Sequence, residues 1–244
     1  MKDCTFTVTE NTAVTADVYR MRLQGDVSAI TAPGQFVNIR LDGLYLRRPI
    51  SVSDLAGDTL TLLYKTVGKG TAKMAALPAG STLSVLTGLG NGYDLTLAGD
   101  APLLLGGGVG VPPLYLLAKK LREQGKPVQV VLGFNKKSEI ILEEEFRALG
   151  CDVTVTTADG SYGVKGFVTD ALPEKYSYFY TCGPEPMLKA VYRATETSGQ
   201  FSFEERMGCG FGACMGCTCK TVTGYKRICK DGPVLKKEEI LWGD

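Results

Sequence analysis

The residues best suited to chemistry are eight cysteines, and five of them fall within residues 201–244. Cys209, Cys214 and Cys217 have the spacing C-x4-C-x2-C, and Cys229 follows after eleven more residues. A [2Fe–2S] cluster needs four thiolates that converge from around it, and this spacing supplies three from one loop and a fourth from further along the chain. The pattern predicts a [2Fe–2S] cluster held by these four cysteines.

The loop that carries the first three cysteines is rich in glycine. Gly208, Gly210, Gly212 and Gly216 lie beside or between the cysteines. Glycine reaches backbone conformations that other residues avoid, and it lets amide N–H groups approach a sulfur atom closely. These positions favour a tightly turned loop around a cluster.

Two alternatives to this ligand set remain open. Cys219 lies two residues beyond Cys217 and would point to the same side if a strand begins at Thr218, but Cys229 closes a longer span and is the expected fourth ligand. Four thiolates also suit a structural zinc ion, although zinc sites usually present two C-x2-C pairs and only one plain pair is present here.

The chain has no histidine. This absence excludes a Ser-His-Asp triad, a His-ligated zinc site, an imidazole proton shuttle and a Rieske-type cluster, which takes two imidazole ligands. No catalytic acid or base is therefore assigned, and the chemistry is expected to come from bound cofactors.

The composition is that of a globular protein of one or two domains. Its 244 residues are 44% hydrophobic and 22% charged, and the net charge of +1 gives no field to attract a nucleic acid. The polar N-terminus does not resemble a signal peptide, and the apolar runs are too short to span a membrane. We expect a cytoplasmic protein, where reducing conditions favour metal-bound cysteines over disulfides.

The hydrophobic pattern divides the chain into three zones. Residues 1–99 are typical of short strands separated by turns, and predict a small β-barrel or sandwich. Residues 100–200 alternate strands with helices, which indicates a parallel sheet covered by helices. Residues 201–244 form a short cysteine-rich module. The expected strands are residues 5–9, 18–23, 36–41, 50–53, 60–67, 83–86, 102–105, 128–132, 152–156 and 176–181, and the expected helices are residues 71–77, 114–124, 143–149 and 185–197.

Two loops of the middle zone follow strands and open helices. One reads GGGVGVPP and the other begins CGPEPM. Loops at the carboxyl ends of parallel strands are where an open α/β sheet binds ligands, and a helix N-terminus favours a pyrophosphate. The pair predicts a nucleotide site with a thiol near a nicotinamide ring; ordinary tight turns are the alternative. The assigned residues are Gly106, Gly108, Gly110, Pro113, Cys182 and Gly183.

The first zone contains a second set of candidate phosphate-binding residues. Arg48 and Ser51 lie three residues apart at the end of a strand, where a guanidinium and a hydroxyl can hold a phosphate oxygen. Gly70 and Thr71 start a short helix whose N–H groups can face a phosphate. Taken alone, these are equally well a surface arginine and a capping threonine.

Together these motifs resemble the ferredoxin–NADP reductase superfamily, which joins a barrel carrying R-x-x-S to G-x-G-x-x-P and C-G-x-x-x-M loops. With residues 47–51 (RRPIS) and 204–210 (EERMGCG), the cysteine-rich C-terminus is similar to the electron transfer subunits of dihydroorotate dehydrogenase B. The resemblance covers essentially the whole chain. It implies a multi-domain β plus α/β fold, with a ferredoxin-reductase-like FAD-binding β-barrel over residues 1–99, a parallel α/β NAD-binding domain over residues 100–200 and a small [2Fe–2S] module over residues 201–244.

The resemblance also implies roles for residues and a partner. An FMN-containing dihydroorotate dehydrogenase subunit would pass electrons through the [2Fe–2S] cluster and FAD to NAD⁺ in pyrimidine biosynthesis, in a heterotetramer of two subunits of each kind. Superfamily members often have an aromatic residue where Ile50 stands here, so flavin stacking is expected to be weaker or to come from another residue, for which Tyr64 is a candidate. The FAD contacts would be Arg48, Pro49, Ile50, Ser51, Leu63, Tyr64, Lys65, Gly70 and Thr71.

Three other interpretations stay open at this point. The chain could be an NAD(P)H-dependent ferredoxin- or sulfur-reductase-type subunit of another flavin and iron–sulfur complex. It could prefer NADP, because Lys136 and Lys137 follow a strand and could accept a 2′-phosphate, although a solvated basic turn is favoured. It could also be a non-enzymatic scaffold with a structural zinc ion and no flavin.

Overall fold

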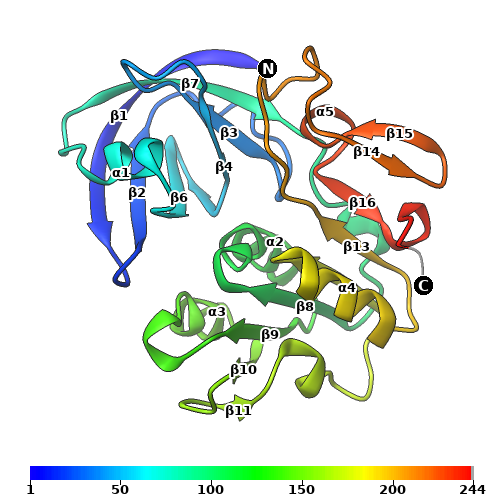
Figure 1. Ribbon diagram of the computed structural model, residues 1–244. Coiled ribbons are helices and arrows are strands. Elements are labelled where there is room, and N and C mark those ends of the chain that lie inside the picture. The colour runs from blue at the N-terminus through cyan, green and yellow to red at the C-terminus, as the bar shows by residue number, and fades with distance from the viewer. Residues whose placement is uncertain (243–244) are drawn as a thin grey trace.

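The computed structural model describes residues 1–242 and contains two large sheets with a smaller C-terminal unit beside them (Figure 1). The first sheet occupies the N-terminal part of the chain, in blue and cyan. The second, in green and yellow, carries helices on its faces. The C-terminal unit, in orange and red, lies next to both, so that the three zones of the sequence meet in the middle of the molecule.

The first sheet has seven strands in the order β4-β3-β7-β1-β2-β6-β5, and every pair of adjacent strands is antiparallel. Alternate residues of β7 are buried, as expected for a sheet with one face on a core. The core includes Phe6, Met21, Val37 and Leu62. The strands are β1 (Lys2–Ala13), β2 (Val18–Gln24), β3 (Phe36–Ile39), β4 (Arg48–Ser51), β5 (Asp54–Ala56), β6 (Thr59–Lys65) and β7 (Thr82–Leu89), and helix α1 (Lys69–Ala75) follows β6.

The second sheet has the strand order β11-β10-β9-β8-β12-β13-β16, and only the β13–β16 pair is antiparallel. The chain moves outward from β8 to β11 and then returns to the other side of β8 with β12. The loops after β8 and β12 therefore leave the same edge at a topological switch point. The elements are β8 (Pro102–Gly107), β9 (Gln129–Phe134), β10 (Asp152–Thr157), β11 (Val164–Lys165), β12 (Tyr178–Cys182), β13 (Gly199–Ser202), β16 (Val234–Lys236), α2 (Pro112–Glu123), α3 (Glu143–Ala148) and α4 (Glu185–Ala194).

Each face of the second sheet has its own core. On one face, Leu104 and Val130 pack with residues of α2 and α3. On the other face, Leu103 and Phe179 pack with residues of α4. Because both faces are covered, β8 is buried along its whole length, and its sequence is a continuous run rather than an alternating one.

The C-terminal unit is a cysteine-bearing loop followed by a hairpin. Strands β14 (Thr218–Thr221) and β15 (Gly224–Arg227) pair with each other, and helix α5 (Ile228–Asp231) leads to β16. The core on the α4 face continues into this unit, since it includes Cys217 and Cys229. Short 3₁₀ turns complete the chain at Leu95–Leu97, Gly108–Gly110, Lys137–Glu139, Val168–Ala171 and Lys237–Glu239.

The sequence pattern located ten strands and four helices that the structure contains, with ends that differ by a few residues. It missed helix α5 and strands β5, β11, β13, β14, β15 and β16, each of which has only two to four residues. Strand β16 shows that the second sheet takes an edge strand from the last zone of the chain, across the expected boundary at residue 201. No helix within residues 1–242 is long and apolar enough to cross a membrane.

Candidate functional site

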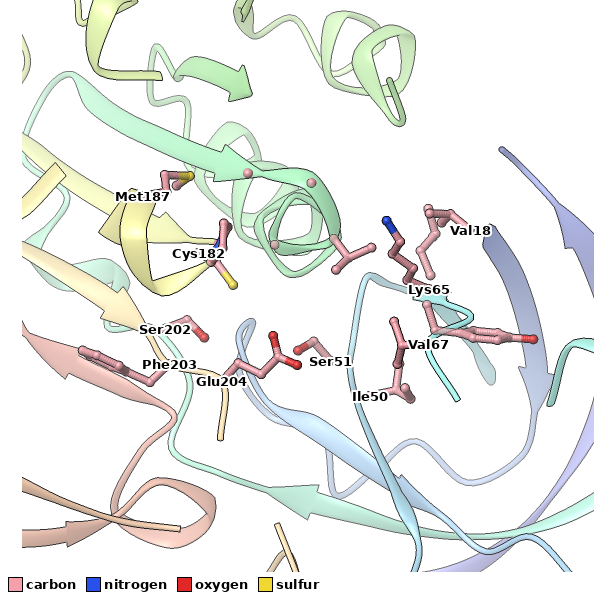
Figure 2. A pocket seen from close by; sticks show the side chains of 18 of the residues that line it. Val18, Ile50, Ser51, Lys65, Val67, Cys182, Met187, Ser202, Phe203 and Glu204 are labelled. Carbon is pink, nitrogen blue, oxygen red and sulfur yellow. The ribbon is translucent and has the colours of Figure 1, made fainter. Parts of the chain in front are cut away.

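A cavity of about 1030 Å³ lies between the two sheets. One wall comes from β4, β6 and the start of α1, and the facing wall comes from the loops after β8, β9 and β12. Residues 202–207, which lead from β13 to the first cysteine of the loop, line the remaining side. Figure 2 shows Ser51, Cys182 and Glu204, one side chain from each of these three parts, around one space.

Most residues assigned to a cofactor from the sequence meet in this cavity. The exceptions are Gly70, Gly106 and Pro113, which lie behind its walls. A Cβ on Gly70 would come within 1.9 Å of the Arg48 side chain, and one on Gly106 would meet Val111 at 2.9 Å, so both glycines allow close packing. The predicted residues that line the cavity are Arg48, Pro49, Ile50, Ser51, Leu63, Tyr64, Lys65, Thr71, Gly108, Gly110, Cys182 and Gly183.

Tyr64 lies in the first wall, with its ring held by the barrel. The ring stacks on Tyr19 with centroids 6.0 Å apart, and the hydroxyl donates to Asn11 Oδ1 at 2.9 Å. Asn11 in turn donates to the carbonyl of Met74 at the end of α1. Burial raises the pKa of Tyr64 well above its usual value. These contacts fix the ring, and its role in flavin stacking stays a prediction.

Lys65 and Thr71 have partners of their own in the same wall. Lys65 pairs with Asp17 at 2.9 Å, and this contact raises the pKa of the lysine. The Thr71 hydroxyl accepts the backbone N–H of Val67 at 2.9 Å and of Gly68 at 3.3 Å. The threonine therefore shapes the turn before α1, and the N–H groups of those two residues are already bonded.

The two loops of the facing wall touch each other through their backbones. A Cβ on Gly110 would lie 2.3 Å from the Cys182 carbonyl oxygen, so only glycine fits at this contact. Gly108 has φ +51° and open space where a Cβ would stand. The first glycine brings the loops together, and the second leaves room above the start of α2 for a ligand to approach the backbone.

Cys182 lies at the end of β12, between the two walls. Burial raises the pKa of its thiol to about 12, with Glu204 raising it further and Ser202 opposing the shift. Figure 2 shows the Glu204 carboxylate and the Ser51 hydroxyl pointing toward one another from opposite sides, with Cys182 nearby. The thiol is neutral at physiological pH, while the carboxylate belongs to an exposed residue.

The cavity also contains residues that the sequence did not assign. Except for Ser202, which ends β13, they come from turns and from a connecting segment that has no periodic pattern, so the sequence gives no local signal for them. The segment EERM enters the sequence analysis only through the family resemblance. The main unassigned lining residues are Arg47, Asn135, Glu139, Ser202, Phe203, Glu204, Glu205, Arg206 and Met207.

The cysteine loop directs backbone N–H groups at sulfur. Cys209 Sγ accepts from Ala213 at 3.2 Å and from Phe211 and Cys214 at 3.5 Å. Cys217 Sγ accepts from the Cys229 N–H at 3.4 Å. Such bonds stabilise thiolates, the form in which cysteine binds iron.

The predicted ligands influence one another and differ in the pKa of their thiols. Burial raises the pKa of Cys209, but hydrogen bonds from the backbone of Cys214 and its neighbours outweigh it and lower the value to about 6. Burial and contact with the Cys217 thiol raise the pKa of Cys229 to about 12. Within residues 1–242, no three potential ligands converge on one ion position.

Cys219 lies on β14, two residues beyond Cys217. It faces Lys226 across the hairpin and packs at the edge of the core on the α4 face. Burial raises its pKa. Its neighbours are those of a small packing residue, and the choice of Cys229 as fourth ligand stays a prediction supported by the Cys217–Cys229 contact.

Two family profiles match the chain. One is described as the iron–sulfur cluster binding domain of dihydroorotate dehydrogenase B and matches residues 204–241. The other is described as an oxidoreductase NAD-binding domain and matches residues 104–193. They cover the cysteine loop and both loops of the facing wall.

Full-length relatives and solved structures agree with these profiles. The chain is 44% identical to the dihydroorotate dehydrogenase B (NAD(+)) electron transfer subunit of Fusobacterium nucleatum, over 98% of each chain. It is 43% identical to the subunit of the same name from Shouchella clausii, over 96% of each chain. It matches a chain of the NADH-dependent reduced ferredoxin-NADP oxidoreductase with a TM-score of 0.87 and 32% identity, over 97% of this chain and 90% of that one. A ferredoxin NADP⁺ reductase from Neisseria gonorrhoeae shares the fold, with a TM-score of 0.69 and 17% identity over 80% of this chain and 90% of that one. The chain belongs to the family of dihydroorotate dehydrogenase B electron transfer subunits.

Proposed function

We propose that this chain is the subunit that carries electrons from a dihydroorotate-oxidising partner to NAD⁺, in pyrimidine biosynthesis. The observation that carries the proposal is the single cavity in which the barrel wall, the nucleotide-type loops and the segment leading to Cys209 meet. A flavin and a nicotinamide held on opposite walls would face each other there. The cysteine loop would hold the cluster next to residues 202–207, which line the remaining side of the cavity.

FAD would be held by the barrel wall. Arg48 would supply charge to a phosphate, and the backbone at Ile50 and Ser51 would lie along the flavin. Leu63, Tyr64 and Lys65 come from the neighbouring strand. The fit is supported by a cavity large enough for a dinucleotide and by an arginine and a lysine on one wall.

NAD would be held by the facing wall. Gly108 and Gly110 would let its pyrophosphate approach the start of α2, and Cys182 with Gly183 would contact the nicotinamide end. The neutral thiol adds no charge that would oppose a cationic ring. Lys136 and Lys137 are exposed on the next loop, so NAD rather than NADP stays a proposal.

The [2Fe–2S] cluster would be bound by Cys209, Cys214, Cys217 and Cys229, for which the spacing and the N–H···S bonds are the support. When bound, the cluster exchanges single electrons, the nicotinamide takes a hydride, and the flavin converts between the two. The chain positions these groups and excludes water, and no residue is assigned as a catalytic acid or base.

The partner would be an FMN-containing dihydroorotate dehydrogenase subunit, because each relative cited above is named as the electron transfer subunit of that enzyme. A heterotetramer with two copies of each chain and a cytoplasmic location are parts of the same proposal. The partner alone would touch dihydroorotate and handle its protons.

The test is reconstitution with the candidate partner. Tagged chain should capture the FMN-containing subunit, and the complex should reduce NAD⁺ when given dihydroorotate. The anaerobically purified complex should show flavin and iron–sulfur absorption. A colourless chain with stoichiometric zinc would overturn the redox function, while a coloured chain that gives its partner no NAD⁺ activity would overturn the dihydroorotate assignment.

A second candidate is supported by the 0.87 TM-score to the NADH-dependent reduced ferredoxin-NADP oxidoreductase chain. In that case the three cofactor sites are kept and the partner differs. NADH-driven reduction of ferredoxin by the captured complex, with no response to dihydroorotate, would favour this candidate.

A further inference from the structure

Asn38 lies where the barrel meets the cysteine loop. It is on β3, and only 1% of the residue is exposed. Its side-chain Nδ2 donates to the carbonyl oxygen of Cys209 at 3.1 Å, across 171 residues of sequence. This bond links the barrel to the first of the proposed cluster ligands.

The orientation of the Asn38 amide follows from this contact. Because the partner is a carbonyl oxygen, the NH₂ group must face it, and a flipped amide would bring two oxygens together. The Oδ1 atom then points into the interior, where no donor within residues 1–242 bonds to it. An unpaired buried oxygen is costly, so an apolar residue would serve packing alone better than asparagine does.

The backbone of Asn38 is fixed to the cavity wall. In the β3–β4 pair it stands opposite Pro49, within the segment proposed to contact the flavin. Arg47 donates from Nη1 to the Asn38 carbonyl at 3.2 Å and to that of Ser84 at 3.3 Å. One residue is thus bonded through its backbone to the flavin wall and through its side chain to the cysteine loop.

The loop is shaped to receive Asn38. Gly210 follows Cys209 with φ +81°, and a Cβ there would lie 2.4 Å from Asn38 Nδ2. The glycine therefore meets two demands at once, a left-handed backbone and a close approach to the amide.

We propose that Asn38 is a positioning residue that holds Cys209, and with it the cluster, at a fixed place relative to the flavin wall. The step it controls moves one electron between reduced flavin and oxidised cluster, with no bond made or broken and with NADH as the source of electrons. The inference rests on the proposed cofactor sites, but it is independent of which protein is the electron-donating partner.

The experiment compares Asn38→Leu and Asn38→Asp with Val37→Ala in the full chain loaded with FAD and cluster. Leucine removes the donor at similar volume, and aspartate keeps the shape but replaces the donor with an acceptor. Val37 is the fully buried neighbour on β3, so its truncation weakens the same strand without touching Cys209. Stopped-flow absorbance after mixing with NADH separates flavin reduction from cluster reduction, and electron paramagnetic resonance of the dithionite-reduced protein reports the cluster environment.

In Asn38→Leu we expect flavin reduction at the wild-type rate, cluster reduction slowed about tenfold and an altered resonance spectrum. Failure of the cluster to assemble in Asn38→Leu, with assembly intact in Val37→Ala, would support the same role. Wild-type cluster kinetics in both Asn38 variants, or an equal slowing or cluster loss in Val37→Ala, would overturn it. A wild-type chain that binds neither flavin nor cluster would instead overturn the proposed function.

Discussion

At the scale of single residues, the surroundings of a cysteine determine how readily its thiol ionises and therefore what role it can have. Cys209 accepts three backbone N–H bonds, Cys182 is half-buried in the cavity wall, and Cys219 packs at the edge of a core. Thiolate formation is favoured at the first and disfavoured at the other two. The same side chain therefore has different expected roles along one chain.

Replacing Cys229 with serine should abolish the cluster, because a hydroxyl is a much poorer iron ligand than a thiolate. Replacing Cys219 with serine should leave it intact, since Cys219 lies on β14 and packs at the edge of a core. Iron and acid-labile sulfide content after anaerobic purification measures both effects. If the Cys219 variant loses the iron and the Cys229 variant keeps it, the ligand assignment is wrong.

Ionisation of Cys182 should cause no change in the rate of NADH oxidation between pH 6 and pH 9. Burial raises its pKa to about 12, so the thiol stays protonated and neutral below that value and would ionise only as the pH rises through it. A Cys182→Ser variant should consequently keep the wild-type pH profile of NADH oxidation, with a rate lowered by about tenfold or less. A step near the ordinary thiol pKa that is present in wild type and missing in the variant would contradict this expectation.

At the scale of elements, the site depends on loops that leave one edge of the second sheet. The contact of Gly110 with the Cys182 carbonyl joins the loop after β8 to the loop after β12. The positions of both loops follow from the return of the chain to β12 beside β8. Because the loops are in backbone contact, a substitution that moves one loop should also displace the other.

Gly110→Ala should force these loops apart, since the new Cβ would stand 2.3 Å from a backbone oxygen. We expect a KM for NADH raised about tenfold or more and a free energy of unfolding lowered by about 1–3 kcal/mol. Steady-state kinetics and denaturant unfolding measure the two effects. Lys137→Ala, on an exposed turn, is the matched control and should leave stability within about 0.5 kcal/mol of wild type.

Elements with strong local patterns were predictable from the sequence, and those defined by distant partners were not. The buried run of β8 and the alternation of β7 mark strands by themselves. Strand β16 has three residues and exists because β13 offers it a partner. In the site, the cysteine spacing and both glycine-bearing loops carry local signals, whereas Glu204 and Asn38 acquire their positions only when the barrel, the second sheet and the C-terminal unit pack together.

At the scale of the whole molecule, the C-terminal unit is bound to both sheets. Asn91, in the connection between them, donates from Nδ2 to the Val234 carbonyl at 2.7 Å, and its Oδ1 accepts the Val234 N–H at 3.1 Å. Its own backbone N–H donates to the Gly232 carbonyl at 2.7 Å. One side chain thus holds the start of β16 in place.

Asn91→Ala should loosen this attachment. Loss of the two side-chain bonds to Val234 is expected to lower the free energy of unfolding by about 1–3 kcal/mol, because the backbone groups lose their partner. Hydrogen exchange should quicken in residues 228–236 and remain unchanged in β1 and β2. Uniform acceleration over the whole chain would show that Asn91 serves general stability instead of this attachment.

The late position of β16 in the chain has a consequence for biosynthesis. During translation β13 emerges with one edge bare, and about thirty residues, including every proposed cluster ligand, must leave the ribosome before β16 can cover it. A nascent chain that stalls within the cysteine loop therefore exposes an open strand edge, the surface on which chains aggregate.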